Sequence, residues 1–108
     1  MFSFFKKKYK TINVQEFKEL KKKSDTVILD VRTRAEQTGG VINGQRNLNV
    51  IDKAFTEKIQ KLDKSKSYLV YCRTGSRSAR ACRIMTKHGF ENIYNLKGGY
   101  VAWESENS

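Results

Sequence analysis

Residues 68–82 read YLVYCRTGSRSARAC, and this stretch decides the fold. Its first four residues form a short apolar run, which is typical of a strand buried on both faces. The run stops at Cys72 and a tight loop follows, after which Ser76 or Ser78 is placed to cap a helix that reaches residues 88–89. The stretch therefore predicts a strand, a tight loop and a helix in direct succession.

The same alternation of short strands and helices continues in both directions from this stretch. Asn13 and Glu16 have the spacing of a capping box, and an apolar stripe follows them. Strands that alternate with helices at these lengths predict an α/β fold, a small parallel β-sheet flanked by helices. The further elements expected are a strand at 9–12, a helix at 13–23, a strand at 27–31, a loop at 39–48 that leads into a short strand, a helix near 51–62, a strand at 92–95 and a one-turn helix around Trp103.

Length and composition predict one small globular domain. The chain has 108 residues, of which 38% are hydrophobic and 31% charged. This is enough apolar sequence to form a core, and no apolar run approaches the roughly 18 residues of a membrane span. We expect a domain over residues 10–106 and a basic N-terminal tip over residues 1–9. The tip places its apolar residues before its lysines, unlike a secretory signal, so we expect a cytoplasmic protein with free thiols.

The charge is strongly positive, with a formal net charge of +11. No acidic residue occurs between Asp63 and Glu91, so the segment that carries Cys72 is basic throughout. Such a field attracts small anions, and it also suits an acidic protein partner. The sequence has no recognised nucleic-acid-binding motif, so we expect no specific nucleic acid, although weak non-specific binding needs only the charge.

Cys72 has the surroundings of a reactive thiol. It stands where a strand ends and a helix begins, so the helix dipole and free main-chain amides face it. Such surroundings lower the pKa of a cysteine and make it a nucleophile. Arg73 and Arg77 add positive charge. Cys82 lies on an apolar stripe of the expected helix and is interpreted as an inert core thiol.

Several motifs occur together in a recognisable order. They are the loop Cys72–Ser78, the run Leu29–Arg32 with Glu36, Asn43-Gly44 followed by Asn47-Leu48, and Leu96–Gly99 with Trp103. With these motifs the chain resembles a single-domain member of the rhodanese (sulfurtransferase) family, whose active-site loop has the form Cys-x-x-Gly-x-Arg-Ser. The chain departs from that family in the region 40–49, where the usual His and Pro are missing.

The resemblance implies a sulfurtransferase that works through a persulfide on Cys72. Sulfur would come from a small anionic donor, either thiosulfate or a low-molecular-weight persulfide, and would pass to a thiol or cyanide-like acceptor. The catalytic residue would be Cys72, and the substrate-binding loop would consist of Arg73, Thr74, Gly75, Ser76, Arg77 and Ser78. Asp30 and Arg32 are expected to support the site by pinning the end of their strand to neighbouring loops, rather than to serve as an acid and an anion ligand. We expect no cofactor, and two cysteines with one histidine cannot complete a closed zinc site.

Two alternatives from other functional classes remain open. The first is a persulfide carrier or interaction module that receives sulfur from a partner protein. The second is a phosphatase or arsenate reductase, which on the same fold places five residues between the cysteine and the arginine. Only four residues separate Cys72 from Arg77, so the second alternative is disfavoured.

Overall fold

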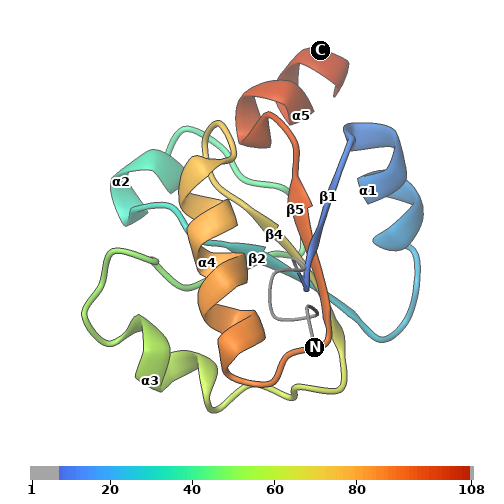
Figure 1. Ribbon diagram of the computed structural model, residues 1–108. Helices are drawn as coiled ribbons and strands as arrows, with labels where there is room; N and C mark the ends of the chain where they lie inside the picture. The colour runs from blue at the N-terminus through green and yellow to red at the C-terminus, as the bar shows by residue number, and fades with distance from the viewer. Residues whose placement is uncertain (1–7, 108) are drawn as a thin grey trace.

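The computed structural model describes residues 8–107, and its centre is a five-stranded parallel sheet (Figure 1). The strand order is β1-β5-β4-β2-β3, with every neighbouring pair parallel. The strands are β1 (Lys10–Ile12), β2 (Thr26–Asp30), β3 (Arg46–Asn47), β4 (Ser67–Tyr71) and β5 (Asn92–Leu96). The predicted α/β fold with a small parallel sheet is confirmed.

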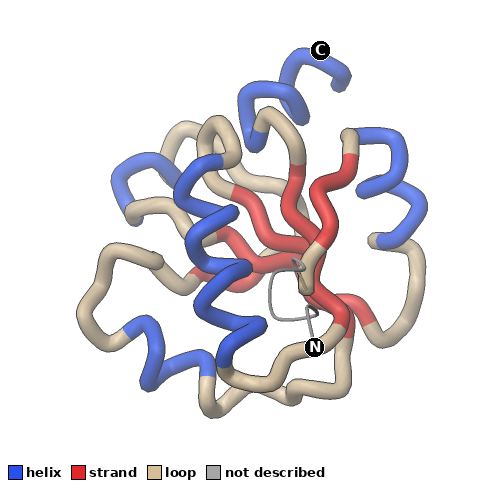
Figure 2. Tube along the Cα trace, viewed as in Figure 1, coloured by secondary structure: helices blue, strands red, loops and turns tan. Residues whose placement is uncertain are grey.

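Helices cover both faces of the sheet, as Figure 2 shows. One face packs against α3 (Phe55–Ile59) and α4 (Ser76–Lys87), and the other against α1 (Val14–Leu20) and α5 (Gly99–Asn107). A short helix, α2 (Arg34–Gln37), follows β2. The central strands β2 and β4 are therefore buried on both sides, which explains why they read as continuous apolar runs.

Each face has its own hydrophobic cluster. On the α4 side, Cys82 and Met85 are fully buried against Val70. On the α1 side, Phe17 makes an edge-to-face contact with Trp103 of α5, at 5.7 Å between ring centroids. This contact joins two helices from opposite ends of the chain and fixes α5 beside the sheet.

The N-terminal region is only partly described. Of the tip expected over residues 1–9, residues 1–7 lie outside the described part of the chain. Tyr9 is buried against the core. The predicted capping box of α1 is confirmed, because Asn13 accepts from the Glu16 amide at 2.8 Å and Glu16 accepts from the Asn13 amide at 3.0 Å.

Four helices differ from the sequence predictions, and the first is α1, which ends at Leu20 rather than at residue 23. The helix expected near 51–62 is confined to Phe55–Ile59, because the Asp52 carboxylate accepts from the Ala54 amide and closes a turn ahead of it. The helix around Trp103 is longer than one turn and begins at Gly99. The helix α2 was not predicted, since its four residues are too few to show a helical period.

The predicted serine cap of α4 is wrong. The N-cap is Gly75, with φ +112° and no capping side chain. A left-handed glycine turns the chain from the loop after β4 directly into the helix, a geometry that a serine would reach only with strain. Ser78 lies inside α4, where its hydroxyl makes contacts other than a cap.

Candidate active site

Cys72 lies at the carboxyl end of β4, directly after Tyr71. Ligands of parallel α/β sheets bind at this edge. Cys72 is only 1% exposed, enclosed by the loop that leads into α4. The Gly75 amide donates to Cys72 Sγ at 3.0 Å, and the Ser78 hydroxyl lies 3.3 Å from the same sulfur. The loop therefore directs hydrogen-bond donors at the thiol.

These donors change the acidity of the thiol. Burial on its own raises the pKa of Cys72. Hydrogen bonds from the Ser78 hydroxyl and from the amides of Ser78, Gly75 and Thr74 lower it, and together they outweigh burial, so the pKa lies below that of an ordinary thiol. A buried sulfur that favours the thiolate fits nucleophilic chemistry.

The loop is held in place from behind by the first turn of α5. The Tyr100 amide donates to the Cys72 carbonyl at 2.8 Å, and the Val101 amide donates to the Arg73 carbonyl at 3.1 Å. These two bonds turn the loop carbonyls towards α5, away from the sulfur. Amides at the start of a helix have no partners within the helix, so the loop satisfies them as well.

Arg77 is held by an acidic residue from α2. Its two terminal nitrogens donate to the two carboxylate oxygens of Glu36, each at 2.7 Å. Glu36 also accepts from the Thr33 amide in the capping box of α2. The hydrogen bonds from Arg77 lower the pKa of Glu36 to about 2. Sequence reasoning named Glu36 only as part of the resemblance and did not foresee this pairing, which ties α2 to α4 across the loop.

The Glu36–Arg77 pair predicts a stability that depends on pH. Because the folded pKa is depressed, the pair stabilises the protein above the unfolded pKa of about 4.5, and this contribution is lost as the pH falls towards 2. Both side chains are partly exposed, so screening reduces the effect to about 1 kcal/mol. Urea unfolding at pH 7 and pH 3 should therefore show a smaller difference for Glu36→Gln than for the wild type.

The matched control for this prediction is Glu57→Gln, since Glu57 is exposed on α3. That variant should keep the wild-type difference between pH 7 and pH 3. An equal difference in Glu36→Gln and the wild type would contradict the prediction.

The other predicted loop residues lie on the surface around the sulfur. Arg73, Thr74 and Ser76 are exposed, whereas Ser78 is fully buried. The structure thus brings one hydroxyl, that of Ser78, against Cys72 Sγ and places those of Thr74 and Ser76 at exposed positions. Cys82 is fully buried within α4, and burial raises the pKa of its thiol.

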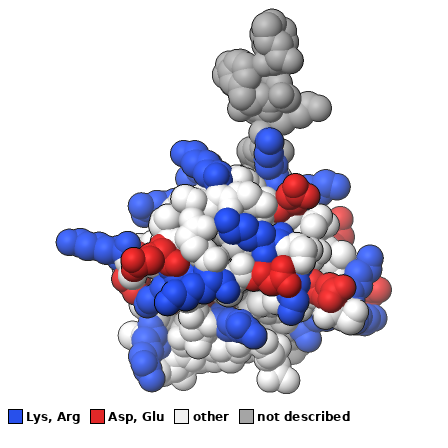
Figure 3. Space-filling model, turned by 90° about the horizontal axis from the view of Figure 1, so that it is seen from below, with Lys and Arg blue, Asp and Glu red and all other residues white. Residues whose placement is uncertain are grey.

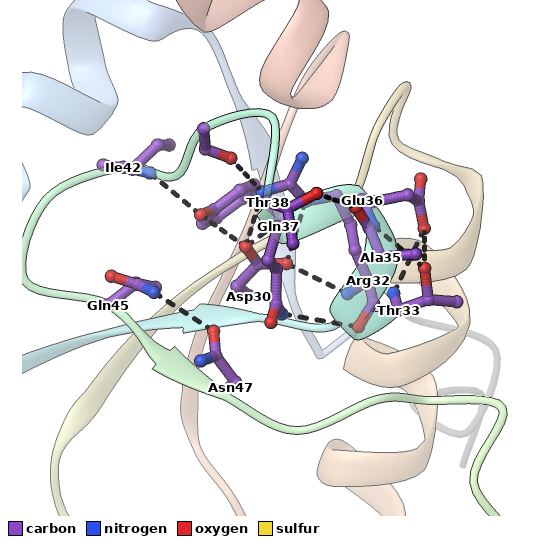
Figure 4. Close-up of polar contacts among 12 residues, drawn as sticks. Asp30, Arg32, Thr33, Ala35, Glu36, Gln37, Thr38, Ile42, Gln45 and Asn47 are labelled. Atoms are coloured by element: carbon purple, nitrogen blue, oxygen red, sulfur yellow. Dashed lines mark hydrogen bonds and ion pairs between the residues drawn. The ribbon is translucent and has the colours of Figure 1, made fainter.

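Asp30 and Arg32 form a buried ion pair beside the loop that follows β2. The Arg32 guanidinium donates to Asp30 Oδ2 at 2.8 Å and to the Gly40 carbonyl at 2.7 Å. The Tyr71 hydroxyl donates to Asp30 Oδ2 at 2.7 Å and accepts from the Ile42 amide. Figure 4 shows Asp30 and Arg32 pointing towards one another. The pair thereby links β2, β4 and the segment 40–42.

Asn95 of β5 is a site residue that sequence reasoning missed. It is 5% exposed, its amide nitrogen lies 3.3 Å from the Gly75 carbonyl, and its oxygen lies 2.5 Å from Ser78 Oγ. The available signal was a polar residue within a strand, since a polar side chain that the sheet buries needs a partner.

Charges of both signs cover the face opposite the candidate site. Figure 3 views the end of the molecule opposite the Cys72 loop, where Lys and Arg side chains are interspersed with Asp and Glu. Within residues 8–107 no three His, Cys, Asp or Glu side chains are grouped so that they could hold a metal ion. No helix in this range is long and apolar enough to cross a membrane.

The central strand of this parallel sheet ends at a cysteine that the loop before a helix encloses, so the chain is an α/β protein with a buried cysteine at the edge of the sheet where ligands bind in such folds. Residues 13–106 match the protein family described as "Rhodanese-like domain". The chain therefore belongs to the rhodanese-like family.

Relatives and solved structures agree with this assignment. The chain is 34% identical over 98 residues to the putative sulfurtransferase YtwF of Bacillus subtilis, which covers 90% of this chain and 92% of that protein. It is 35% identical over 97 residues to the thiosulfate sulfurtransferase GlpE of Coxiella burnetii, covering 90% and 89%. A rhodanese-related protein from Thermoplasma volcanium superposes with a TM-score of 0.80 at 31% identity, covering 91% and 93%.

The family also occurs within longer proteins. The chain is 34% identical over 100 residues to the tRNA uridine(34) hydroxylase of Cytophaga hutchinsonii, which covers 90% of this chain but only 32% of that protein. The relatives that match this chain over nearly their whole length include YtwF and GlpE, both of which are named as sulfurtransferases.

Proposed function

We propose that the protein is a sulfurtransferase that carries sulfur as a persulfide on Cys72, with thiosulfate or a low-molecular-weight persulfide as donor. The observation that supports this most directly is the convergence of the Gly75 amide and the Ser78 hydroxyl on Cys72 Sγ, at 3.0 and 3.3 Å. Donors aimed at a sulfur stabilise its anionic form. We further propose that the protein works in the cytoplasm, where Cys72 stays reduced.

The proposed reaction has two steps. The Cys72 thiolate attacks the outer sulfur of thiosulfate, a sulfur–sulfur bond forms, and the donor's own sulfur–sulfur bond breaks so that sulfite leaves with the electron pair. The outer persulfide sulfur then carries the negative charge. An acceptor such as cyanide or a thiolate attacks that sulfur, and the electron pair of the broken bond returns to Cys72 as thiolate. Neither step needs a protein acid, because each leaving group, sulfite in the first step and the Cys72 thiolate in the second, is stable as an anion.

Several contacts support the roles proposed for the remaining residues. The amides from Arg73 to Ser78 are proposed to hold the terminal sulfur, and Gly75 provides the left-handed turn that directs them. Exposed Arg73 is proposed to attract the anionic donor, together with Thr74 and Ser76. Arg77 is proposed to stabilise the loop, since Glu36 already occupies its guanidinium. The buried pair Asp30–Arg32 is proposed to fix the end of β2.

The test is intact mass spectrometry after incubation with thiosulfate or with glutathione persulfide. The expected result is a gain of one sulfur atom that cyanide removes. If neither donor loads the protein, small-molecule sulfur transfer is contradicted.

A persulfide carrier with a protein donor is the second candidate. One observation favours it: Val101, whose amide donates to the main-chain carbonyl of Arg73, has an apolar side chain that is 45% exposed. Ionic strength separates the two candidates. Docking of a protein through many surface charges slows steeply as salt screens it, whereas loading from thiosulfate or glutathione persulfide involves only the few charges at the loop and should depend on salt more weakly.

A further inference from the structure

Ser78 has one hydroxyl proton and three acceptors within reach. Its oxygen lies 2.5 Å from Asn95 Oδ1, 3.1 Å from the Gly75 carbonyl and 3.3 Å from Cys72 Sγ. Ser78 is 0% and Asn95 5% exposed, so bulk water has little access to the pair. A hydroxyl donates one hydrogen bond at a time. The three acceptors therefore compete for a single proton.

While the sulfur is neutral, Asn95 Oδ1 is the preferred acceptor of the Ser78 hydrogen bond. The amide nitrogen of Asn95 donates to the Gly75 carbonyl at 3.3 Å, which leaves the amide oxygen facing Ser78. The Gly75 carbonyl also accepts from the Ala79 amide at 3.1 Å, so it does not depend on Ser78. A neutral thiol is a weak acceptor, and an amide oxygen is a better one.

We propose that Asn95 is a positioning residue: its Oδ1 accepts the hydrogen bond from the Ser78 hydroxyl while Cys72 Sγ is neutral, and the hydroxyl donates to Sγ instead when the sulfur carries negative charge. The exchange is a rotation about the Cβ–Oγ bond of Ser78, in which no covalent bond forms or breaks. The proton of the thiol itself passes to solvent. Hydrogen bonds to charged acceptors are the stronger ones, which provides the driving force.

This inference rests on the proposed function, because it follows the charge on Cys72 Sγ through sulfur transfer. In the persulfide the charge lies on the outer sulfur, so the Ser78 hydroxyl returns to Asn95. When an acceptor removes the outer sulfur, Sγ becomes a thiolate again and the hydroxyl turns back to stabilise it. Ser78 thus assists the leaving thiolate, and Asn95 holds the hydroxyl ready in between.

Loss of the Asn95 side chain is expected to increase the reactivity of Cys72 rather than to reduce it. Removing Asn95 as an acceptor leaves the Ser78 hydroxyl free for the sulfur, so Asn95→Leu should make Cys72 more reactive. At pH values below the pKa of the Cys72 thiol, its alkylation by iodoacetamide should become about three- to tenfold faster. Ser78→Ala removes the donor and should slow alkylation by a similar factor. In the Ser78→Ala background, Asn95→Leu should give no acceleration.

The experiment is the pH profile of alkylation in the full chain, read from the mass of the peptide that contains Cys72. Asn92→Leu is the matched control, since Asn92 is exposed at the other end of the same strand, and it should leave the profile unchanged. If Asn95→Leu slows alkylation, or acts equally with and without Ser78, then Asn95 only shapes the loop and the proposal is overturned.

A second variant keeps the test valid if Asn95→Leu fails to fold. Asn95→Asp has nearly the same shape, and once its buried carboxyl is ionised the carboxylate holds the Ser78 hydroxyl and repels an anionic sulfur. Alkylation at a pH above that ionisation should therefore be about tenfold slower than in the wild type. An unchanged or faster rate would overturn the proposal. Alkylation uses no sulfur donor, so it tests the role of Asn95 independently of sulfur transfer. If the alkylation profiles are as expected but the protein takes up no sulfur, the proposed function is refuted and the role of Asn95 is not.

Discussion

Cys72→Ser is expected to abolish sulfur loading and to lower the rate of sulfur transfer from thiosulfate to cyanide by about 10³-fold or more. A hydroxyl in place of the thiol is not ionised near neutral pH, so the nucleophile of the proposed mechanism is lost. Serine is similar in size to cysteine and can accept from the Gly75 amide that now bonds the sulfur. The fold should therefore survive, and the loss should appear in the mass spectrum and in the rate of thiocyanate formation.

Cys82→Ala is the control for this prediction. Cys82 is fully buried in α4, where burial raises the pKa of its thiol, so it makes a poor nucleophile. That variant should load one sulfur as the wild type does. If sulfur loading persists in Cys72→Ser and vanishes in Cys82→Ala, then Cys82 carries the sulfur and the mechanism is refuted.

The elements that sequence predicted well depend on short-range patterns. The runs at 27–31 and 68–71 have the apolar character of strands buried on both faces, and the sheet places β2 and β4 at its centre. The capping box of Asn13 and Glu16 depends on groups three residues apart. Patterns of this kind are complete within one stretch of chain, so no tertiary information is needed to recognise them.

The features that sequence missed depend on contacts between distant segments. The helix α2 is only four residues long, and its Glu36 contacts Arg77, 41 residues further along the chain. The expectation that Arg77 would meet an anionic donor did not foresee that Glu36 holds its guanidinium. No pattern local to either residue indicates the pairing.

The cap of α4 failed for a different reason. The serine rule assumes a helix that begins in open chain, where a hydroxyl is the best partner for the first amides. Here the amides at the start of α4 face a sulfur atom, and the sharp turn requires Gly75 at φ +112°. Ser78 is correspondingly directed at Cys72 and Asn95.

The candidate site also contains a part that could be predicted from sequence and a part that could not. Its loop, residues 72–78, is contiguous and could be recognised whole from the sequence. The contacts that hold the loop from outside could not be predicted: Asn95 of β5 was missed, and Gly99, at the start of α5, was recognised only as part of a motif, without its contact with the loop. Such residues touch the loop only after the sheet has brought the carboxyl ends of β4 and β5 together.

Gly99→Ala is expected to lower the rate of sulfur loading about 10²-fold. A Cβ at this position would lie 2.5 Å from the Arg73 carbonyl and 2.6 Å from the Cys72 oxygen, and both are main-chain atoms that cannot rotate away. The loop must therefore shift, and the bonds from the Tyr100 and Val101 amides must shift with it. Because the positive φ of +60° adds strain, unfolding should require about 2–4 kcal/mol less.

Gly44→Ala separates backbone strain from the clash with the loop. Gly44 also has a positive φ, +88°, but nothing lies within 4 Å of the position of its Cβ. This variant should lose about 1 kcal/mol of stability and load sulfur at the wild-type rate. If both variants lose stability equally and both load normally, the contact of α5 with the Cys72 loop does not position the sulfur. Slow loading by Gly99→Ala alone, measured on folded protein, would mean that the first turn of α5 sets the loop geometry on which the reaction depends.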